Sequence, residues 1–436
     1  MGAFNREQTR GDLAALQSPV LATCFLKMNS THPCWCGESD LAEFSPEYLR
    51  CESCQTLVVR NWPPAEQFDV VHDESDFYGR SYYESHLTQE YGLPSLEERA
   101  RNDLNERCMH WMRTVLKYRL PPARTLELGS AHGGFVALMR WAGFDAAGLE
   151  ISPSLVKYAK STFGVPMLTG TIEKQGLEPR SLDMILHFDV LEHLPDPRTT
   201  MRRCMELLKP DGLMIFQTPC FPVGQTYEEM VRKKSRFPEM LKAPDHLHLF
   251  SRESVTRLFS ELGAPFLYFE RAIFDHYDMS AVVSAHELTT HSEEEATEAL
   301  LRRPEGRIIR ALLDANAQYK ELGAQYKELG AQYKELGAQY KELARRYDES
   351  EADRAARLQL LREADTQIRE IEARRKAIEQ VLLKMDASYK LQMSHGLARV
   401  LRRLQSPLKM DALYKAMEER LASNSMADGA NAAQEG

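Results

Sequence analysis

The sequence predicts an α/β protein whose central domain holds a parallel sheet, with a cysteine-bearing module before it and a long helical segment after it. Three observations carry this prediction. From Pro121 onward, short apolar strands alternate with glycine-containing turns and apolar-periodic helices. Four cysteines cluster within residues 34–54. Residues 317–344 contain four consecutive copies of the heptad AQYKELG, except that the last copy ends in Ala instead of Gly.

Length, charge and apolar content narrow the class of protein. A chain of 436 residues is too long for one compact core and is long enough for two or three units. The net charge of −9 argues against the positive field of a general nucleic-acid binder, so no nucleic-acid partner is expected. The N-terminus has no apolar core of a secretory signal, and no run of about 18 apolar residues occurs. We therefore expect a cytoplasmic protein.

The cysteine cluster predicts a structural zinc site. Cys34 and Cys36 form one close pair, and Cys51 and Cys54 form a second. In a cytosolic chain such pairs indicate metal rather than disulfides, and four thiolates close a tetrahedral zinc site. The first pair has C-x-C spacing, which leaves His32 open as a substitute ligand. The alternative is four unligated cysteines, two of them in a small core.

The central domain opens with a βαβ unit. A strand at 125–128 leads into a turn with Gly129 and Gly133, a helix follows, and a second strand at 146–149 ends in Glu150. Glycine lets a ligand approach the backbone closely, because it carries no Cβ. An acid roughly 20 residues after the glycines can bind both hydroxyls of a ribose.

Three more strands are expected: one ending near 171–173, one at 184–187, and one in LLKPDGLMIFQTP after a helix end and a tight turn. Their loops would build one cleft at the carboxyl ends of the strands. Asp189, Glu192 and His193 form a D-x-x-E-H set that could bind a hard divalent cation if helical. The preferred alternative is that Glu192 and His193 form a buried hydrogen-bonded pair.

Motifs over roughly residues 120–265 resemble those of class I S-adenosylmethionine-dependent methyltransferases. They are the spacing E-x-G-x-A-x-G, then FDVLEHLPDP and LLKPDGL. The cysteine pairs, GTIE and DHLHLFS are similar to a bacterial subgroup that has an N-terminal zinc ribbon and acts mainly on sugars and glycans. The resemblance implies a Rossmann-like fold and S-adenosylmethionine as the cofactor.

The resemblance also assigns cofactor-binding residues by position. They are Glu127, Gly129, Ser130, Ala131 and Gly133 around the methionine part, Glu150 at the ribose, and Ile151, Thr171, Ile172 and Glu173 around the adenine. Phe188 and Asp189 would floor the methyl-transfer site. Tyr82 and Tyr83 stand where related enzymes place a lid or clamp, with simple aromatic packing as the alternative.

Transfer of a methyl group to a hydroxyl calls for a general base whose pKa lies near the working pH, and histidine fits best. His193 and His246 rank level as candidates. His248 would face the same side as His246 if the segment is extended.

The repeats predict a coiled coil. Tyr319 at a and Leu322 at d begin a seam that continues more loosely past residue 347. Its later members are Leu361, Ile368, Ile371, Ile378, Leu382 and Met385. Gly323, Gly330 and Gly337 each cost about 1 kcal/mol of helix propensity, so self-association as a dimer or trimer is expected to supply the stability. One helix folding back on the enzyme is the alternative, and a straight rod would be roughly 100 Å long.

The tail suggests partners as well. Enzymes that cap bacterial O-polysaccharides are similar in plan, with a coiled coil between the capping domain and a membrane-associated polymerase. Leu397, Val400, Leu401 and Leu404 share a helical face flanked by arginines. Such a helix can lie on an anionic membrane, which would make the protein peripheral on the inner face, or dock on a partner. Packing within the oligomer is the alternative.

The expected divisions are 1–62 (zinc-ribbon-like module), 63–118 (helical lead-in and lid), 119–285 (methyltransferase domain), 286–308 (linker), 309–390 (coiled coil), 391–421 (basic amphipathic helices) and 422–436 (disordered tail). The predicted function is O-methylation of a sugar or glycan acceptor, at the end of a bacterial surface polysaccharide. Alternatives are a C- or O-methyltransferase of a nucleotide-linked sugar or small molecule, and a coiled-coil scaffold with a degenerate methyltransferase fold.

Overall fold

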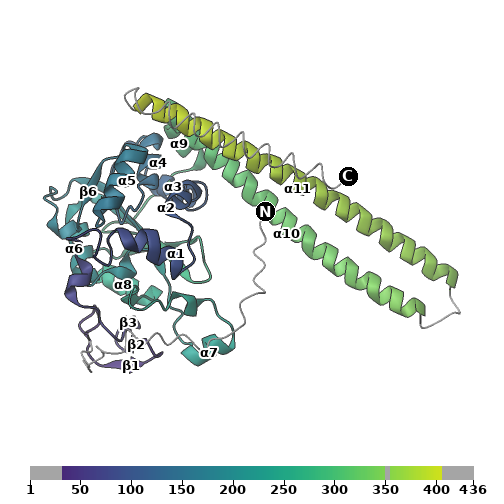
Figure 1. Cartoon of the computed structure of the whole chain (residues 1–436), viewed down its shortest axis with the longest axis horizontal. Coiled ribbons are helices and arrows are strands. Elements are labelled where there is room, and N and C mark those ends of the chain that lie inside the picture. The colour runs from purple at the N-terminus through teal and green to yellow at the C-terminus, as the bar shows by residue number, and fades with distance from the viewer. Residues whose placement is uncertain (1–31, 349–353, 405–436) are drawn as a thin grey trace.

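A seven-stranded sheet forms the centre of the computed structural model, which describes residues 32–348 and 354–404 (Figure 1). In sheet order the strands are β10 (Phe266–Glu270), β11 (Asp278–Ser284), β8 (Leu208–Pro219), β7 (Leu182–Phe188), β4 (Arg124–Leu128), β5 (Asp145–Glu150) and β6 (Met167–Thr169). From β8 to β6 the neighbours are parallel, whereas β11 and β10 add an antiparallel edge. The strand order reverses beside β4, so a crevice opens at the carboxyl ends of β4 and β7.

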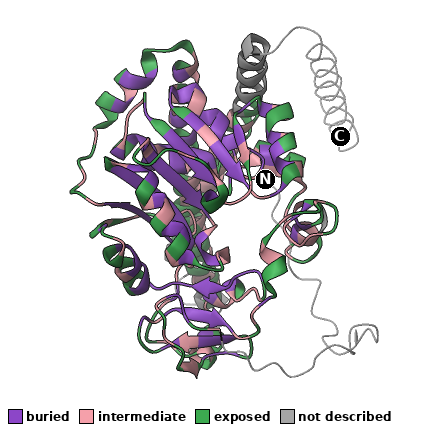
Figure 2. Ribbon diagram, turned by 90° about the vertical axis from the view of Figure 1, so that its left-hand side faces the viewer, coloured by how far each residue is buried: buried purple, intermediate pink, exposed green. Residues whose placement is uncertain are grey.

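Helices cover both faces of this sheet. One face packs on α3 (Arg107–Tyr118), α4 (Gly134–Ala142), α5 (Pro153–Phe163), α9 (Glu293–Leu301) and the first turns of α10 (Pro304–Asp348); the other packs on α6 (Pro197–Leu207) and α8 (Arg252–Glu261). Successive side chains of a strand enter opposite cores, as Met184 and Ile185 of β7 do. Figure 2 shows the buried strands between these layers. The predicted α/β class with a Rossmann-like sheet is confirmed.

Two strand ends differ from the sequence prediction. The predicted turn in LLKPDGL lies inside β8, because Leu182 pairs with Leu208 while Met184 pairs with Leu213. The residues between 208 and 213 therefore bulge out of the pairing rather than end it. The third strand ends at Thr169, and Ile172–Lys174 forms a turn of 3-10 helix instead. Glycine and proline in the bulge favoured the turn interpretation from sequence alone.

The segment before the sheet is helical and crosses the open side of the crevice. It holds a 3-10 turn (Ala65–Phe68), a π-helical turn (Tyr82–His86), α1 (Leu87–Gln89) and α2 (Leu96–Asn102). Ser95 and Glu98 cap α2 reciprocally, side chain to backbone in both directions. A further short helix, α7 (Tyr227–Arg232), follows β8.

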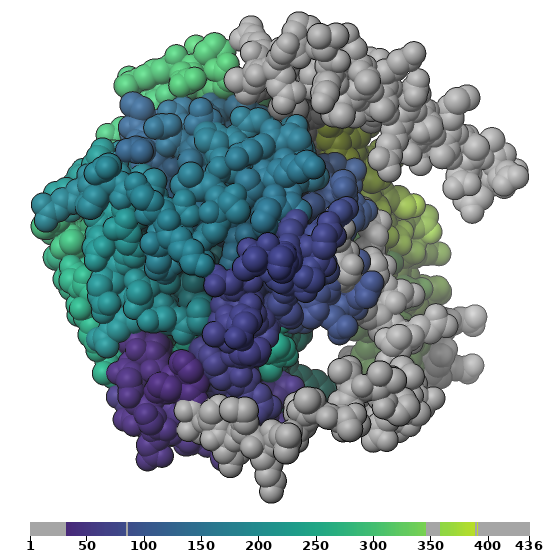
Figure 3. All heavy atoms as spheres, turned by 60° about the vertical axis from the view of Figure 1, so that its left-hand side comes forward, coloured from purple at the N-terminus to yellow at the C-terminus, as the bar shows by residue number. Residues whose placement is uncertain are grey.

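The N-terminal module is a small antiparallel sheet that borrows one strand from the central domain. Its strands are β1 (Leu41–Glu43), β2 (Tyr48–Cys51), β3 (Leu57–Val59) and β9 (His248–Leu249). Leu57 pairs with Leu249 and Val58 with His248. Figure 3 shows this purple module directly against the teal body of the central domain.

The heptad segment folds as a hairpin rather than as a single rod. Helix α10 leaves the central domain, and α11 (Arg354–Leu404) returns beside it in the opposite direction (Figure 1). Tyr333 donates a hydrogen bond of 2.9 Å to Glu372, and the guanidinium of Arg375 lies 5.7 Å from the Tyr333 ring centroid. Most of the seam predicted from sequence faces this partner: Leu322, Tyr326, Leu329, Leu336, Leu361, Ile368, Ile371 and Ile378 are half-buried, and Leu382 is buried. Two predicted seam residues, Tyr319 and Tyr340, are exposed instead.

A continuous rod of roughly 100 Å therefore does not form within the described residues, because the two halves of the frame pair with each other. Self-association of the hairpin remains a prediction. The expected membrane-binding or partner-binding helix lies in residues 391–421, where side chains are outside the described part, as is the tail at 422–436. Within the described residues, no helix is long and apolar enough to cross a membrane.

Candidate active site

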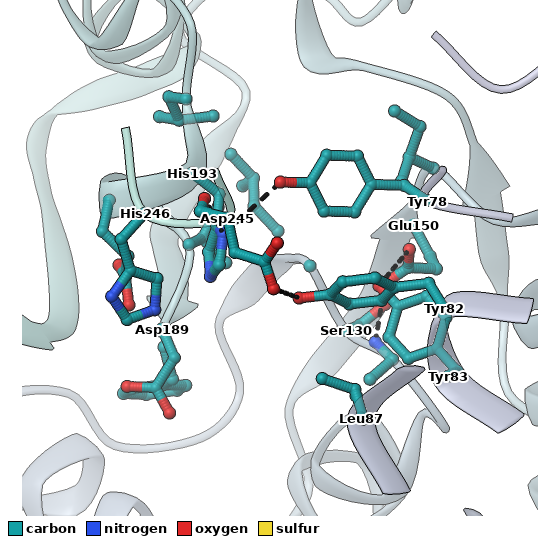
Figure 4. A pocket seen from close by; sticks show the side chains of 18 of the residues that line it. Tyr78, Tyr82, Tyr83, Leu87, Ser130, Glu150, Asp189, His193, Asp245 and His246 are labelled. Atoms are coloured by element: carbon teal, nitrogen blue, oxygen red, sulfur yellow. Dashed lines mark hydrogen bonds between the residues drawn. The ribbon is translucent and has the colours of Figure 1, made fainter. Parts of the chain in front are cut away.

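A cavity of about 1220 Å³ lies at the carboxyl ends of β4, β5 and β7. The predicted residues that line it are Glu127, Gly129, Ser130, Ala131, Glu150, Ile151, Thr171, Ile172, Glu173, Phe188, Asp189, His193, His246 and Tyr83. Two predicted site residues, Gly133 and His248, do not line this cavity. Figure 4 shows the histidines and Asp189 on one side of the cavity and the tyrosines with Glu150 and Ser130 on the other.

The turn after β4 has a left-handed backbone at three residues and packs tightly against its neighbours. Gly129 has φ +64°, and a Cβ there would lie 2.5 Å from a methyl of Val190. Ala131 also has positive φ, +44°, and its N–H donates to Glu150 at 2.9 Å. Gly133, with φ +76°, is required in the same way, because a Cβ there would lie 2.7 Å from Ala159 of α5.

Glu150 ends β5 with its carboxylate aimed across this turn. Besides the Ala131 N–H, it accepts the N–H of Ser152 at 3.1 Å and the hydroxyl of Tyr83 at 3.4 Å. Burial raises the pKa of Glu150, while these hydrogen bonds act in the opposite direction. The Tyr-rich segment thus reaches Glu150 through Tyr83, and its role as a lid or cofactor clamp stays a prediction.

Glu127 carries a buried carboxyl oxygen, Oε2, that has no hydrogen-bond partner among the described residues. Burial, and then the nearby Glu150, raise the pKa of Glu127 well above its ordinary value. Such a group is costly unless a ligand donates to it. A cationic amino group bound in the turn would satisfy this oxygen and favour the carboxylate.

The predicted adenine side is more exposed. Ile172 is buried, whereas Thr171 is half-buried and Glu173 is exposed. The carboxylate of Glu173 accepts the Thr200 hydroxyl at 2.5 Å, so it is already engaged. Ile172 and Ile151 provide the apolar surface on which a flat ring could pack.

Phe188 ends β7 and Asp189 follows it, at the floor of the cavity. Phe188 stacks on Trp111 with ring centroids 4.1 Å apart. Asp189 has φ +57° and accepts hydrogen bonds from Arg107 at 2.9 Å and from the Gln217 side-chain amide at 3.2 Å. Because its carboxylate is paired with Arg107, Asp189 is suited to orienting neighbours rather than to taking a proton.

His193 and His246 meet edge to face, with ring centroids 4.9 Å apart. Nδ1 of His193 lies 2.8 Å from the carbonyl oxygen of Asp245, and Nδ1 of His246 lies 2.8 Å from that of Met240. A carbonyl only accepts, so each Nδ1 carries the proton and each Nε2 keeps its lone pair. Burial lowers the pKa of both rings, that of His246 further because His193 and Lys242 lie close by.

Glu192 belongs to the same corner. Its Oε2 accepts the Thr218 hydroxyl at 2.9 Å, and burial raises its pKa well above the ordinary value. Ligand atoms of Glu192, His193 and His246 lie within 4.8 Å of one another, a spacing that a metal ion could use. Asp189 of the predicted D-x-x-E-H set is not in this group, because residues 191–193 form a 3-10 turn rather than an α-helical face.

His248 lies away from the cavity. It is fully buried in β9, with Trp62 at 5.4 Å and Phe250 at 6.0 Å between ring centroids. Burial lowers its pKa to about 3. His246 and His248 do not share one side of an extended segment, because β9 begins only at His248. The structure assigns His248 to packing between the module and the central domain.

The sequence also resembles known methyltransferases. Residues 99–265 match the family model described as a methyltransferase domain. This chain contains a methyltransferase domain. Ubiquinone biosynthesis O-methyltransferase of Xanthomonas campestris pv. campestris is 33% identical over 105 residues, 23% of this chain and 44% of that protein. The protein of the same name in Ralstonia nicotianae is 27% identical over 140 residues, 31% of this chain and 58% of that protein.

The chain thus spans about half the length of the curated relatives it matches. Among solved structures, an S-adenosylmethionine-dependent methyltransferase of Thermotoga maritima, titled a possible histamine N-methyltransferase, is 17% identical. It covers 46% of this chain and 99% of its own, with a TM-score of 0.34. The residues in the turn suit S-adenosylmethionine as the cofactor of this methyltransferase domain. Glu127 offers an unpaired acceptor for its amino group, and Glu150 offers two oxygens for its ribose.

The four cysteines of the N-terminal module come together as predicted. Their sulfur atoms lie within 4.8 Å of one another, with 3.5 Å between Cys34 and Cys54 and 3.6 Å between Cys36 and Cys51. A tetrahedral zinc fits such a set. His32 is not part of it, since its ring stacks on Trp62 at 3.6 Å.

Sequence reasoning missed Asp245, which is 1% exposed. Its carboxylate contacts three side chains of the segment that precedes α2. Its Oδ2 accepts the Tyr91 hydroxyl at 2.6 Å and the Tyr82 hydroxyl at 3.4 Å, and lies 3.1 Å from Nε2 of His86. Tyr82 therefore reaches the histidine side of the cavity while its neighbour Tyr83 reaches Glu150. The dense aromatics of DFYGRSYYESH hinted at a lid, but nothing nearby in sequence marks Asp245 as its anchor.

Proposed function

We propose that this protein transfers a methyl group from S-adenosylmethionine to a hydroxyl of a sugar or glycan acceptor. One observation carries the proposal: the cofactor cradle lines the same cavity as half-buried His193 and buried His246, whose Nε2 atoms have no hydrogen-bond partner among the described residues. When bound, the cofactor supplies an electrophilic methyl group on a sulfonium. The chain's own residues then have to hold both reactants and remove the hydroxyl proton.

His193 is the better base of the two. Asp245 and Asp189 partly offset the effect of burial on its pKa, whereas His193 and Lys242 push the pKa of His246 further down. A base is most effective when its pKa is near the working pH. The Asp245 carbonyl fixes the tautomer, so Nε2 of His193 takes the proton while Nδ1 keeps its own.

Asp189 and Phe188 complete this side of the cavity. Arg107 and Gln217 hold the Asp189 carboxylate, and Trp111 holds the Phe188 ring flat. The lid residues Tyr78 and Tyr82 line the opposite wall. Because Tyr82 is hydrogen-bonded across to Asp245, this wall would exclude water and leave the acceptor hydroxyl as the nucleophile.

The acceptor we propose is the end of a bacterial surface polysaccharide. Its support is the resemblance of the cysteine module and the DHLHLFS segment to glycan-modifying enzymes, together with the aromatic cavity wall. The hairpin of α10 and α11 would act as a spacer and as the contact for a second copy, a polymerase or the inner face of a membrane. The proposal places the protein in the cytoplasm.

The test uses purified protein, labelled S-adenosylmethionine and polysaccharide from the protein's own source. Wild type is compared with His193→Ala and with the exposed-site control His276→Ala. Label in long glycan that is lost only in His193→Ala would support both the acceptor and the base. Cofactor binding without transfer to any glycan would remove the polysaccharide from the proposal.

A second function is favoured by the Glu192, His193 and His246 cluster. The two relatives named above are ubiquinone biosynthesis O-methyltransferases, and a small phenolic acceptor is compatible with the same cavity. In a metal-assisted phenol methyltransferase, a divalent cation at these three ligands would hold a phenolate oxygen. Chelation of the cation would then abolish transfer to a phenol. Transfer to phenols that survives chelation and is absent with glycans would leave a metal-free phenol methyltransferase.

A further inference from the structure

The cysteine module is joined to the histidine corner of the cavity by main-chain hydrogen bonds. β3 pairs with β9, and the Val59 N–H donates to the Leu247 carbonyl at 2.9 Å. His246 therefore lies two residues before β9, the strand that pairs with the module. The cofactor residues belong to a different sheet, on β4 and β5.

Tyr48 adds a side-chain link at the same place. It is fully buried in β2, and its hydroxyl donates a 2.8 Å hydrogen bond to the carbonyl oxygen of His246. Burial raises the pKa of Tyr48 well above its ordinary value, so the hydroxyl stays a donor. Cys51 ends the same strand, three residues further on.

The held segment in turn orients His193. The Leu247 N–H donates to the Glu192 carbonyl at 2.7 Å, and the Asp245 carbonyl accepts from Nδ1 of His193. Residues 245–247 are thus bonded on one side to the module and on the other to residues 192–193. A shift of this segment would change where Nε2 of His193 points.

We propose that Tyr48 is a positioning residue for the base, and that the cysteine module acts on the acceptor half of the active site and not on the cofactor half. The inference rests on the proposed function, since it takes His193 as the base. Zinc held by the four cysteines would fix the turn between β2 and β3 and, through β3, the position of β9.

The experiment compares Tyr48→Phe with a matched control, Tyr118→Phe, in the full chain. Tyr118 is also a buried tyrosine, and its hydroxyl binds Glu270 far from the cavity. Three quantities are measured: amide hydrogen exchange of residues 245–250, affinity for S-adenosylhomocysteine, and kcat and KM for labelled methyl transfer. In Tyr48→Phe, exchange at 245–250 is expected to speed up and kcat to fall about tenfold, part of the roughly 10²–10⁴ that a positioned base contributes.

Cofactor affinity should stay within about twofold of wild type, because the turn after β4 and Glu150 at the end of β5 are untouched. Chelation of metal from the wild type gives a second measurement that needs no variant, and it should raise exchange at 245–250 in the same way. Unchanged exchange at 245–250 in Tyr48→Phe and after chelation would overturn the proposal. A loss of cofactor affinity equal to the loss of kcat would also overturn it, since the module would then support the whole domain.

The outcome can be separated from failure of the proposed function. Hydrogen exchange and cofactor binding need no acceptor, so the link from Tyr48 to residues 245–250 is tested even where no methylated product is found. Altered exchange with retained cofactor binding, but no transfer by wild type, would keep the link and remove the proposed acceptor. Altered exchange with unchanged kcat would remove the positioning role.

Discussion

The imidazole rings of His193 and His246 lie 4.9 Å apart at a 79° angle, each with Nδ1 against a main-chain carbonyl. Two segments distant in sequence thus present two unprotonated Nε2 atoms in one corner of the cavity, where His246 is buried and His193 is half-buried. Such a pair can take a proton from an acceptor at neutral pH, or hold a cation with Glu192.

Replacement of the proposed base should reduce turnover far more than binding. We expect His193→Ala to lower kcat by about 10²–10⁴ with little change in cofactor affinity, because only proton transfer is lost. His246→Ala should cost less, as the pKa of His246 lies further from neutrality. Steady-state kinetics with isothermal titration of the cofactor measures both effects. Equal losses in the two variants would point to a shared role such as metal binding.

The pH profile follows from the same pKa shifts. Because burial lowers the pKa of His193 below about 6.5, the base is unprotonated throughout the neutral range. The value of kcat/KM should rise with pH only below about 6.5 and be level from pH 7 to 8. A profile still rising between pH 7 and 9 would contradict a histidine base and favour a group of higher pKa.

Acid should destabilise the fold through two other buried histidines. Burial lowers the pKa values of His187 and His248 to about 3, whereas the unfolded chain protonates them near 6.5. Their neutral forms favour the folded state fully above about pH 6.5, and this contribution is lost as pH falls towards 3, at up to about 1.4 kcal/mol per pH unit for each group. Urea unfolding at pH 7, 6 and 5 measures the slope.

A variant pair checks the source of that slope. His187→Leu should flatten the pH dependence of the unfolding free energy, because Leu fills the apolar site beside Phe216 without titrating. His276→Leu, at an exposed site, should leave the slope unchanged. Equal slopes in wild type and both variants would show that other groups control acid stability.

Local patterns were enough to predict the parallel centre of the sheet, because most of its strands are short apolar runs with a glycine or an acid at the carboxyl end: Gly129 after β4, Glu150 at the end of β5, Gly170 after β6 and Asp189 after β7. The antiparallel edge was harder, since β10 carries exposed aromatic residues such as Phe266 and Tyr268 and shows no clean alternation. The strand β9 is two residues long and becomes a strand only by pairing with β3. No local propensity marks such an element.

The cofactor half of the site was predictable for a related reason: its residues follow consecutive strands, so their spacing carries the geometry. The acceptor half is assembled from distant segments. Arg107 comes from α3, Asp245 from the loop before β9 and Asp278 from β11, where burial and the Asp189 charge raise its pKa to about 8. Only folding brings these three side chains together, and their spacing in the sequence does not predict that they are neighbours.

Cofactor affinity should depend on Glu150. Glu150→Gln is expected to weaken S-adenosylmethionine binding by roughly 10- to 150-fold, the effect of losing hydrogen bonds to a charged group. Tyr83→Phe should change it by less than about fivefold, since the Tyr83–Glu150 hydrogen bond is long at 3.4 Å. Exposed Glu178→Gln serves as the control. Equilibrium dialysis with labelled cofactor measures all three, and an unaffected Glu150→Gln would remove the ribose role.

Substitution of a glycine in the heptad repeats tests whether α10 pairs only with α11 or also packs against a second chain. A Cβ at Gly330 would meet nothing within 4 Å, so Gly330→Ala should gain about 1 kcal/mol of helix propensity at no steric cost. Amide exchange over 317–345 should then slow about fivefold, while Ala331→Gly, at an exposed neighbour, should speed it by a similar factor. If a second chain instead packs closely on the glycine face, Gly330→Ala would weaken association. Sedimentation equilibrium of the two variants would show a shift towards monomer for Gly330→Ala alone.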